Sequence, residues 1–411
     1  MINRRTVLAG FAGLAVSACS GSDVTVPVRA QNPEFLPTPN PGYDAWVKGF
    51  RQRARTKGIS ENTLASGFRG TGYLPGVIDR DRNQTEFTRT LEDYIAIAAS
   101  DERVARGRAA ILSQRSKLDS IERQYGVPPH VVGAIWGLES RYGERRGDIP
   151  VISALSTLAF DGRRGSFFEN QLIAALKILQ NGDVPASRMK GSWAGAMGHT
   201  QFIPTSYLAY AVDFNGDGKR DIWSKDPGDA LASAASYLKR SGWVSGQPWG
   251  MEVRLPDGFS AGGAGRGNTK SVAAWTALGV RDPDGRRIAD HGKSWILPPE
   301  GGPGPAFMMF RNATVISRYN RSIKYVIGVG HLSDRLNGGG PLRATFGPDE
   351  KGMTLADRKA LQIRLTARGF DTGGTDGVIG PKTENAIRAY QRSAGLAQTG
   401  EPSLALLRKL G

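Results

Sequence analysis

The spacing of apolar residues predicts helices over most of the first 340 residues. Between residues 43 and 125, apolar side chains recur at helical steps, which is typical of amphipathic helices. Residues 128–143 follow the same rule, with prolines in the first turn and Gly143 as a stop signal. Further helices are expected at residues 152–160, 167–179, 230–240 and 317–336.

A different pattern predicts a small β-rich insert within this helical region. Residues 249–255 and 307–316 are rich in side chains that favour strands, and residues 257–269 are rich in glycine. The fold class expected from these patterns is mainly α, with this insert as the β component of an α+β protein.

The last part of the chain predicts a separate module. Residues 337–353 are rich in Gly and Pro and predict a linker. Residues 354–411 then carry a pattern of three helices, which is enough for a small domain. The expected helices cover residues 354–368, 381–394 and 403–410.

One carboxylate lies on the apolar face of the helix predicted at residues 128–143. Glu139 follows Ile135 by four positions and Val132 by seven, so it continues the buried face. Burial and the negative end of the helix dipole both disfavour its charged form, so we expect a raised pKa. A carboxyl group that is protonated near neutral pH can act as a general acid. A structural role, paired with Arg141 or Arg145, remains open on this pattern alone.

Residues 213–229 resemble a calcium-binding loop. Gly218 holds the sixth position, where such loops turn sharply, whereas Ser224 replaces the Glu that is usual at position twelve. Oxygen donors at alternate positions can wrap one hard cation, so we predict a structural calcium site. The alternative is a polar turn that binds nothing. The candidate ligands are Asp213, Asn215, Asp217, the carbonyl oxygen of Lys219, and Asp229.

Other catalytic chemistries find little support in the sequence. The Ser236–Lys239 spacing matches S-x-x-K, but no K-T-G accompanies it, and no phosphate-binding glycine loop is present. Catalysis therefore depends on a carboxylate. The histidines are scattered and lack the spacing of metal ligands: they are His130, His199, His291 and His331.

Charge and the N-terminus favour a role at the cell envelope. The formal net charge is +16, and such basic proteins bind polyanions such as nucleic acid, anionic lipid or an anionic cell-wall polymer. Basic runs with interleaved aromatics are missing from the sequence, so we expect no nucleic-acid partner. Residues 1–18 predict an export signal, and Arg4 with Arg5 would suit a twin-arginine signal.

Cys19 follows the predicted signal in a sequence that resembles a bacterial lipoprotein box, so we predict that it is acylated. It is the only cysteine, which excludes an internal disulfide. Residues 19–42 would then form a tether from the membrane.

Four motifs in residues 43–336 resemble those of the lytic murein transglycosylase B family. Residues 354–411 resemble a three-helix peptidoglycan-binding domain, whose D-G-x-x-G-x-x-T turn is present at residues 376–383. The order of the motifs favours a catalytic Glu139 over a structural one. The four motifs lie at residues 137–143 (GLESRYG), 195–204 (GAMG, then QFIP), 213–221 and 318–320 (RYN).

The resemblance implies a lysozyme-like catalytic domain in residues 43–336. Family members cleave the β-1,4 bond between N-acetylmuramic acid and N-acetylglucosamine without water and leave a 1,6-anhydromuramoyl end. Glu139 would be the single acid/base, without a catalytic cofactor. Ordinary glycosidases need two carboxylates, and no second acidic residue has a comparable setting. A hydrolytic muramidase and a non-catalytic wall-binding scaffold remain the alternatives.

The resemblance also implies binding residues and a location. Arg163 or Arg164 would face a peptide or lactyl carboxylate, and the late Asp of the family's calcium loop corresponds to Asp229. The partners implied are peptidoglycan strands, the membrane through Cys19, and other cell-wall enzymes. The location implied is the periplasm, with an anchor in the outer membrane. The residues implied to line the glycan cleft are Tyr94, Ser192, Gln201, Tyr237, Tyr319, Asn320 and Tyr325.

Overall fold

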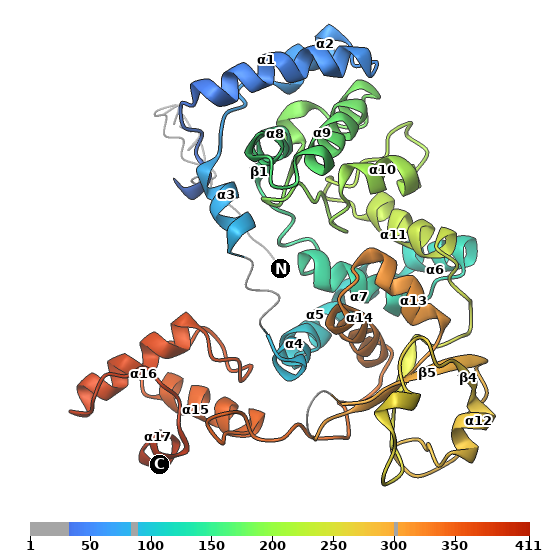
Figure 1. Ribbon diagram of the computed structural model, residues 1–411, viewed down its shortest axis with the longest axis vertical. Helices are drawn as coiled ribbons and strands as arrows, with labels where there is room; N and C mark the ends of the chain where they lie inside the picture. Colours follow the sequence, from blue (N-terminus) through green and yellow to red (C-terminus); the bar gives the residue numbers. More distant parts are fainter. Residues whose placement is uncertain (1–32, 84–88, 300–302) are drawn as a thin grey trace, which may run out of the picture.

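The computed structural model describes residues 33–83, 89–299 and 303–411, and these are mostly helical (Figure 1). The predicted signal peptide and Cys19 lie outside the described residues. The helices of the first part are α1 (Pro41–Thr56), α2 (Glu61–Gly67), α3 (Pro75–Arg82), α4 (Leu91–Ala98), α5 (Asp101–Ser113), α6 (Arg115–Tyr125), α7 (Pro129–Ser140), α8 (Val151–Asp161), α9 (Gly165–Gln180), α10 (Pro204–Tyr210), α11 (Gly228–Arg240), α13 (Arg311–Tyr319) and α14 (Ile323–Leu336).

Helix α7 is the central element of this helical body. It packs against α5, α6, α11 and α14, and every side chain from Val131 to Gly137 is buried. The largest apolar cluster of the protein runs from α1 through α7 to α14. The helix predicted at residues 128–143 is therefore confirmed. Its burial and its contacts with four helices hold it in place within the body.

The predicted β-rich insert is confirmed as a four-stranded antiparallel sheet. Its strand order is β3-β6-β5-β4, and α12 (Val272–Ala277) covers it. The insert has an apolar cluster of its own, centred on Trp275, Ile296 and Met308. The strands of the sheet are β3 (Gly250–Val253), β4 (Lys270–Ser271), β5 (Lys293–Leu297) and β6 (Ala306–Met309), and a two-residue ladder pairs β1 (Ile149–Pro150) with β2 (Lys190–Gly191).

Two predictions near residue 317 were wrong. The expected strand at residues 307–316 ends at Met309, and α13 occupies the rest. The single helix expected at residues 317–336 is interrupted: Tyr319 ends α13, and α14 begins at Ile323. Asn320 has an extended backbone, and its side-chain carbonyl accepts the Ser322 N–H at 2.9 Å. This local hydrogen bond competes with the helical one and separates α13 from α14.

The three helices predicted near the C-terminus are confirmed as α15 (Leu355–Ala367), α16 (Pro381–Ser393) and α17 (Leu404–Lys409). They share an apolar cluster that is separate from that of the helical body. Thr354 and Asp357 form a capping box that fixes the start of α15. In Figure 1 this C-terminal module lies to one side of the molecule and the β-rich insert to the other.

Asp334 at the end of α14 gives a prediction for stability against pH. It accepts a hydrogen bond from the Trp249 indole at 2.9 Å, and desolvation of its carboxyl group raises its pKa to about 7. In the unfolded chain an Asp ionises near pH 4. Between these values Asp334 binds more protons in the folded protein than in the unfolded chain, so its contribution to the free energy of unfolding falls as pH rises.

We therefore expect Asp334→Asn to raise the free energy of unfolding at pH 8 by roughly 1 kcal/mol, because solvent screens a side chain that is more than a third exposed. The gain should vanish towards pH 4. Urea titrations of both proteins across this range measure it. The exposed Asp257 is the control, because Asp257→Asn should change stability by less than about 0.5 kcal/mol at any pH. A difference in stability between Asp334→Asn and the wild type that stays constant from pH 4 to pH 8 would contradict the assignment.

Candidate active site

Glu139 lies in the last turn of α7 and is partly exposed. The chain turns sharply after the helix, because Arg141 and Tyr142 both adopt left-handed conformations, with φ of 53° and 59°. Gly137 makes this turn possible, since a Cβ there would lie 2.6 Å from the Tyr142 ring. Arg141 pairs with Glu102 and Glu144 on the surface, and not with Glu139 as the structural interpretation expected.

Tyr325 holds the Glu139 carboxyl group from α14. Its hydroxyl donates to Glu139 Oε1 at 2.6 Å, and its ring is buried. Burial first, and then the charge of Glu139, raise the pKa of Tyr325 well above 10. The phenol therefore stays protonated, so it remains a hydrogen-bond donor that fixes the orientation of the carboxyl group.

A row of tyrosines extends from this hydrogen bond. Tyr319 stacks on Tyr325 with ring centroids 6.5 Å apart, Tyr237 lies 4.8 Å from Tyr319, and Tyr210 lies 4.5 Å from Tyr237. Burial and the Glu139 charge also raise the pKa of Tyr319. The structure thus brings together three of the predicted cleft residues and adds Tyr210, which the sequence analysis missed.

The loop between β2 and α10 connects to this row. Tyr319 donates its hydroxyl proton to the Thr200 carbonyl oxygen at 2.8 Å. Gln201 has a left-handed backbone (φ 49°), and its amide donates to the carbonyl oxygens of Gly198 and Arg146. The Ser192 hydroxyl accepts the Ala196 N–H at 3.1 Å. These contacts hold the predicted polar residues of the loop in defined positions.

The remaining predicted cleft residues lie on other elements. Tyr94 on α4 packs on α14, where a Cβ at Gly328 would lie 2.6 Å from its ring. Asn320 caps the break between α13 and α14. Arg163 and Arg164, in the turn between α8 and α9, both pair with the buried carboxylate of Asp81. Their own side chains remain about half exposed, so each can still face solvent or a ligand.

His199 lacks the spacing of a metal ligand, yet it joins the end of α7 to residues 221–229. Its Nδ1 accepts the Trp136 indole N–H at 3.1 Å, so the proton lies on Nε2, which faces the Ser224 carbonyl oxygen at 2.9 Å. Burial lowers the pKa of His199 to about 4, which keeps the ring neutral. Ser140 also donates to the His199 carbonyl oxygen. An isolated histidine gives no spacing signal that could have revealed this.

Residues 213–229 form the loop that the calcium motif predicts. Asp213 accepts backbone N–H groups from Gly216, Asp217 and Gly218. Asp229, the buried member, accepts the N–H groups of Phe214 and Asp221 and so ties the two ends of the loop together. Burial, with a contribution from the Asp213 charge, raises the pKa of Asp229.

This loop could bind a hard cation only if side-chain and backbone oxygen atoms acted as ligands together. In the part of the chain that the structure describes, no group of three or more His, Cys, Asp or Glu side chains is arranged to hold a metal ion. The carboxylates of Asp213 and Asp217, an Asn side chain and a backbone carbonyl would therefore have to bind together with Asp229.

Comparison with known families identifies the chain. A model described as "Transglycosylase SLT domain" matches residues 42–334, and one described as "Putative peptidoglycan binding domain" matches residues 354–410. The chain therefore belongs to the SLT-domain transglycosylase family and carries a peptidoglycan-binding domain at its C-terminus.

Individual relatives agree with this assignment. SltB3 from Pseudomonas aeruginosa, solved in complex with NAG-NAM-pentapeptide, is 46% identical with a TM-score of 0.73 over 90% of this chain and 100% of that one. Escherichia coli Slt35, solved in complex with calcium, is 27% identical with a TM-score of 0.61 over 74% of this chain and 96% of that one. These neighbours confirm the predicted lysozyme-like, mainly helical fold class.

A curated relative covers less of the protein. Membrane-bound lytic murein transglycosylase B of Escherichia coli is 36% identical over 216 residues, which are 51% of this chain. The match spans 56% of that relative's length. None of the described helices is long and apolar enough to cross a bilayer.

The contacts of His199 predict a structural effect. His199→Ala would leave the buried Trp136 N–H without an acceptor and open a cavity beside α7. We expect a loss of about 2 to 4 kcal/mol in the free energy of unfolding, measured by urea titration at pH 7. The matched control is His291→Ala at a less buried position, where we expect a loss below about 1 kcal/mol. Equal losses in the two variants would contradict the bridging role.

Proposed function

We propose that the chain is a peptidoglycan lytic transglycosylase in which Glu139 is the single general acid/base. The observation that carries the proposal is the Tyr325–Glu139 hydrogen bond at the end of a row of tyrosines. It holds one carboxyl group beside a row in which Tyr319 and Tyr210 are partly exposed and suited to stacking on sugar rings. Membership in the transglycosylase family and the names of the relatives support the reaction class.

The proposed reaction begins with Glu139 as an acid. Its carboxyl group donates a proton to the oxygen between C1 of the muramoyl residue and the next glucosamine. The C1–O bond then breaks, and the glucosamine leaves with a new hydroxyl group. Positive charge develops at C1, next to the carboxylate that Glu139 has become.

In the second half, Glu139 acts as a base. It removes the proton from the 6-hydroxyl of the same muramoyl residue while that oxygen forms a bond to C1. The product is a 1,6-anhydromuramoyl end, and Glu139 regains its proton. Water is not consumed, so one carboxyl group suffices, whereas hydrolysis with two carboxylates needs a second one on the other side of the sugar.

The surrounding residues would bind and orient the glycan. Tyr325 fixes the carboxyl group, and the side chains that the resemblance assigned to the cleft supply stacking faces and neutral hydrogen bonds. Arg163 and Arg164, which both pair with Asp81, would also bind a carboxylate of the substrate. The cleft side chains of this proposal are Tyr94, Ser192, Gln201, Tyr237, Tyr319, Asn320 and Tyr325, joined by Tyr210.

Export and anchoring belong to the same proposal. Residues 1–18, with Arg4 and Arg5, would direct the chain to the periplasm, and acylated Cys19 would anchor it in the outer membrane. The word "membrane-bound" in the name of the Escherichia coli relative supports an anchor. Residues 43–336 would act on the wall, while residues 354–411 bind it, and other cell-wall enzymes are further candidate partners.

Removal of the acid tests the mechanism. Glu139→Gln keeps the shape and the Tyr325 contact but cannot cycle a proton, so turnover of purified sacculi should fall by about 10²- to 10⁴-fold. Binding to sacculi should stay unchanged. Mass spectrometry of the released muropeptides should find anhydro ends with the wild type.

The matched control is Glu144→Gln, five residues further on, where the side chain is exposed and pairs with Arg106. It should keep full turnover. Reducing muramic acid ends as the sole wild-type product would establish the muramidase alternative instead. Equal binding by all proteins without any wild-type turnover would establish the scaffold.

We further propose a structural calcium ion in the loop of residues 213–229. Asp229 is buried close to Asp213, and burial raises its pKa, so a cation would stabilise its charged form. The calcium complex of Slt35 also supports the proposal. Calcium in excess should raise the melting temperature, because a ligand that binds only the folded state stabilises it. At 100 times the dissociation constant the gain is about 2.7 kcal/mol.

A chelator titration by calorimetry measures this effect. Asp213→Asn should weaken the response, while Asp257→Asn in the insert should leave it intact. An identical melting temperature with calcium and with chelator would refute an occupied site.

A further inference from the structure

A buried arginine joins the C-terminal module to the helical body. Arg358 lies on α15, and only 5% of it is exposed. Its Nε donates to the Gly377 carbonyl oxygen of its own module, and its Nη1 donates to Asp349 of the linker, both at 2.9 Å. Its Nη2 donates to Glu92 at 2.6 Å and to Asp93 at 3.1 Å, both on α4.

This side chain carries the polar connection between the two parts. Among the described residues, every hydrogen bond and ion pair found between residues 354–411 and residues 33–336 is made by Arg358. The apolar clusters of the two parts are separate, so no shared core fixes their orientation. The guanidinium group can do so because its planar fork reaches several acceptors in fixed directions.

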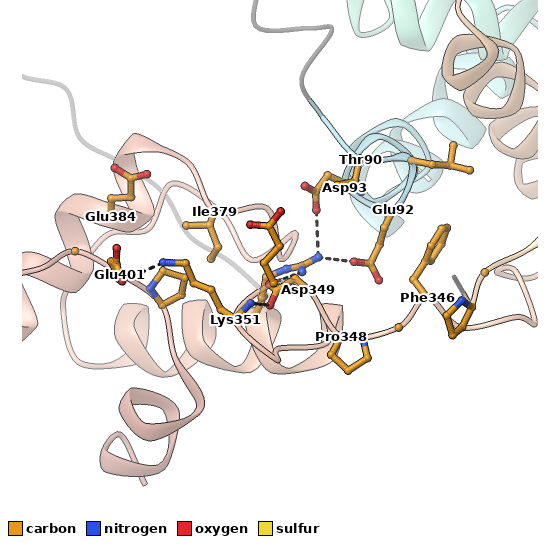
Figure 2. A pocket seen from close by; sticks show the side chains of 18 of the residues that line it. Thr90, Glu92, Asp93, Phe346, Pro348, Asp349, Lys351, Ile379, Glu384 and Glu401 are labelled. Carbon is orange, nitrogen blue, oxygen red and sulfur yellow. Dashed lines mark hydrogen bonds and ion pairs between the residues drawn. The ribbon is translucent and has the colours of Figure 1, made fainter. Parts of the chain in front are cut away.

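The space around the contact is open. A cavity of about 790 Å³ lies between α4, the linker and the module. Figure 2 shows Glu92 and Asp93 on the α4 side and Asp349 and Lys351 in the linker, with Glu401 of the module paired to Lys351. An interface that encloses such a cavity is not closely packed, so the charged contact sets its geometry.

The same helix forms part of the proposed cleft. α4 packs on α14, and Tyr94 follows Glu92 and Asp93 directly in sequence. The Tyr94 ring lies against Gly328, one turn beyond Tyr325, which holds Glu139. Three consecutive residues of α4 thus contact the module at Arg358 and the catalytic helix pair at Tyr94.

We propose that Arg358 is a positioning residue for the transglycosylase reaction: it docks the wall-binding module on α4 and thereby fixes the Tyr94 wall of the glycan cleft. This proposal rests on the proposed function. Glu139 stands on α7, which Arg358 does not touch. Loss of the contact should therefore weaken substrate binding while it leaves the chemical step intact.

The experiment uses the full mature chain and a soluble peptidoglycan tetrasaccharide. Arg358→Ala should raise KM by about threefold to tenfold and keep kcat within about twofold, since it displaces a binding wall and not the acid/base. Glu92→Gln/Asp93→Asn should give the same split from the α4 side, with the contacts of Arg358 to Gly377 and Asp349 intact. Arg358→Lys keeps the positive charge without the planar fork, so it should raise KM less than Arg358→Ala does.

The matched control is Arg388→Ala. Arg388 lines the same cavity, and its described polar partners, Glu384 and Asn385, lie within the module. It should keep the wild-type KM. Small-angle X-ray scattering should find a larger radius of gyration for Arg358→Ala than for the wild type or Arg388→Ala.

Three kinetic results would overturn the proposal. The first is an unchanged KM in both Arg358→Ala and Glu92→Gln/Asp93→Asn. The second is an equal rise in KM in Arg388→Ala. The third is a rise in KM in Arg358→Ala but not in Glu92→Gln/Asp93→Asn, because the effect would then come from contacts within the module. A wild type without turnover would refute the proposed function instead, and an unchanged radius of gyration in Arg358→Ala would still refute the docking.

Discussion

The hydrogen bond from Tyr325 to Glu139 is the interaction on which the arrangement of the site depends. Helix α7 is surrounded by other helices, so a carboxyl group at its end needs a polar partner from a neighbour. Tyr325 on α14 supplies such a partner, and the hydrogen bond holds the two helices in one register. Gly137 and Gly328 permit the close packing of Tyr142 and Tyr94 that surrounds this pair.

The other features of the site follow from holding that pair in place. The tyrosine row continues the packing of Tyr325 away from the carboxyl group. His199 secures the opposite side of α7 through Trp136 and Ser140. Its lowered pKa keeps the ring uncharged, so the contact persists across the pH range in which carboxylates and phenols change little. The loop of residues 213–229 reaches α7 through this same histidine.

Periodicity predicted the fold well where single helices bury one face. It located α7, α8, α9, α11 and the three C-terminal helices, because each shows the apolar spacing that its burial requires. It failed at residues 307–336, where a strand gives way to two helices within a few residues. There a side-chain hydrogen bond of Asn320 decides where a helix ends, and apolar spacing does not record such a bond.

The site was predictable only in part, for a related reason. Glu139 could be found from its place in the helical period, and the tyrosines from family motifs. The contacts of Tyr325, His199 and Arg358 join residues that are far apart in sequence, and no local pattern encodes them. The pairing of Arg163 and Arg164 with Asp81 is of the same kind, since it links two separate helix ends.

The separate apolar cluster of the C-terminal module has a consequence for how the protein opens. This cluster can lose its order without exposing the core of the helical body, so the module forms a cooperative unit of its own. The insert differs, because Trp295, Phe307 and Met309 of β5 and β6 belong to the cluster of the body. Amide protons of the module would then exchange with solvent at a rate of their own, whereas those of the insert and the body would follow one another.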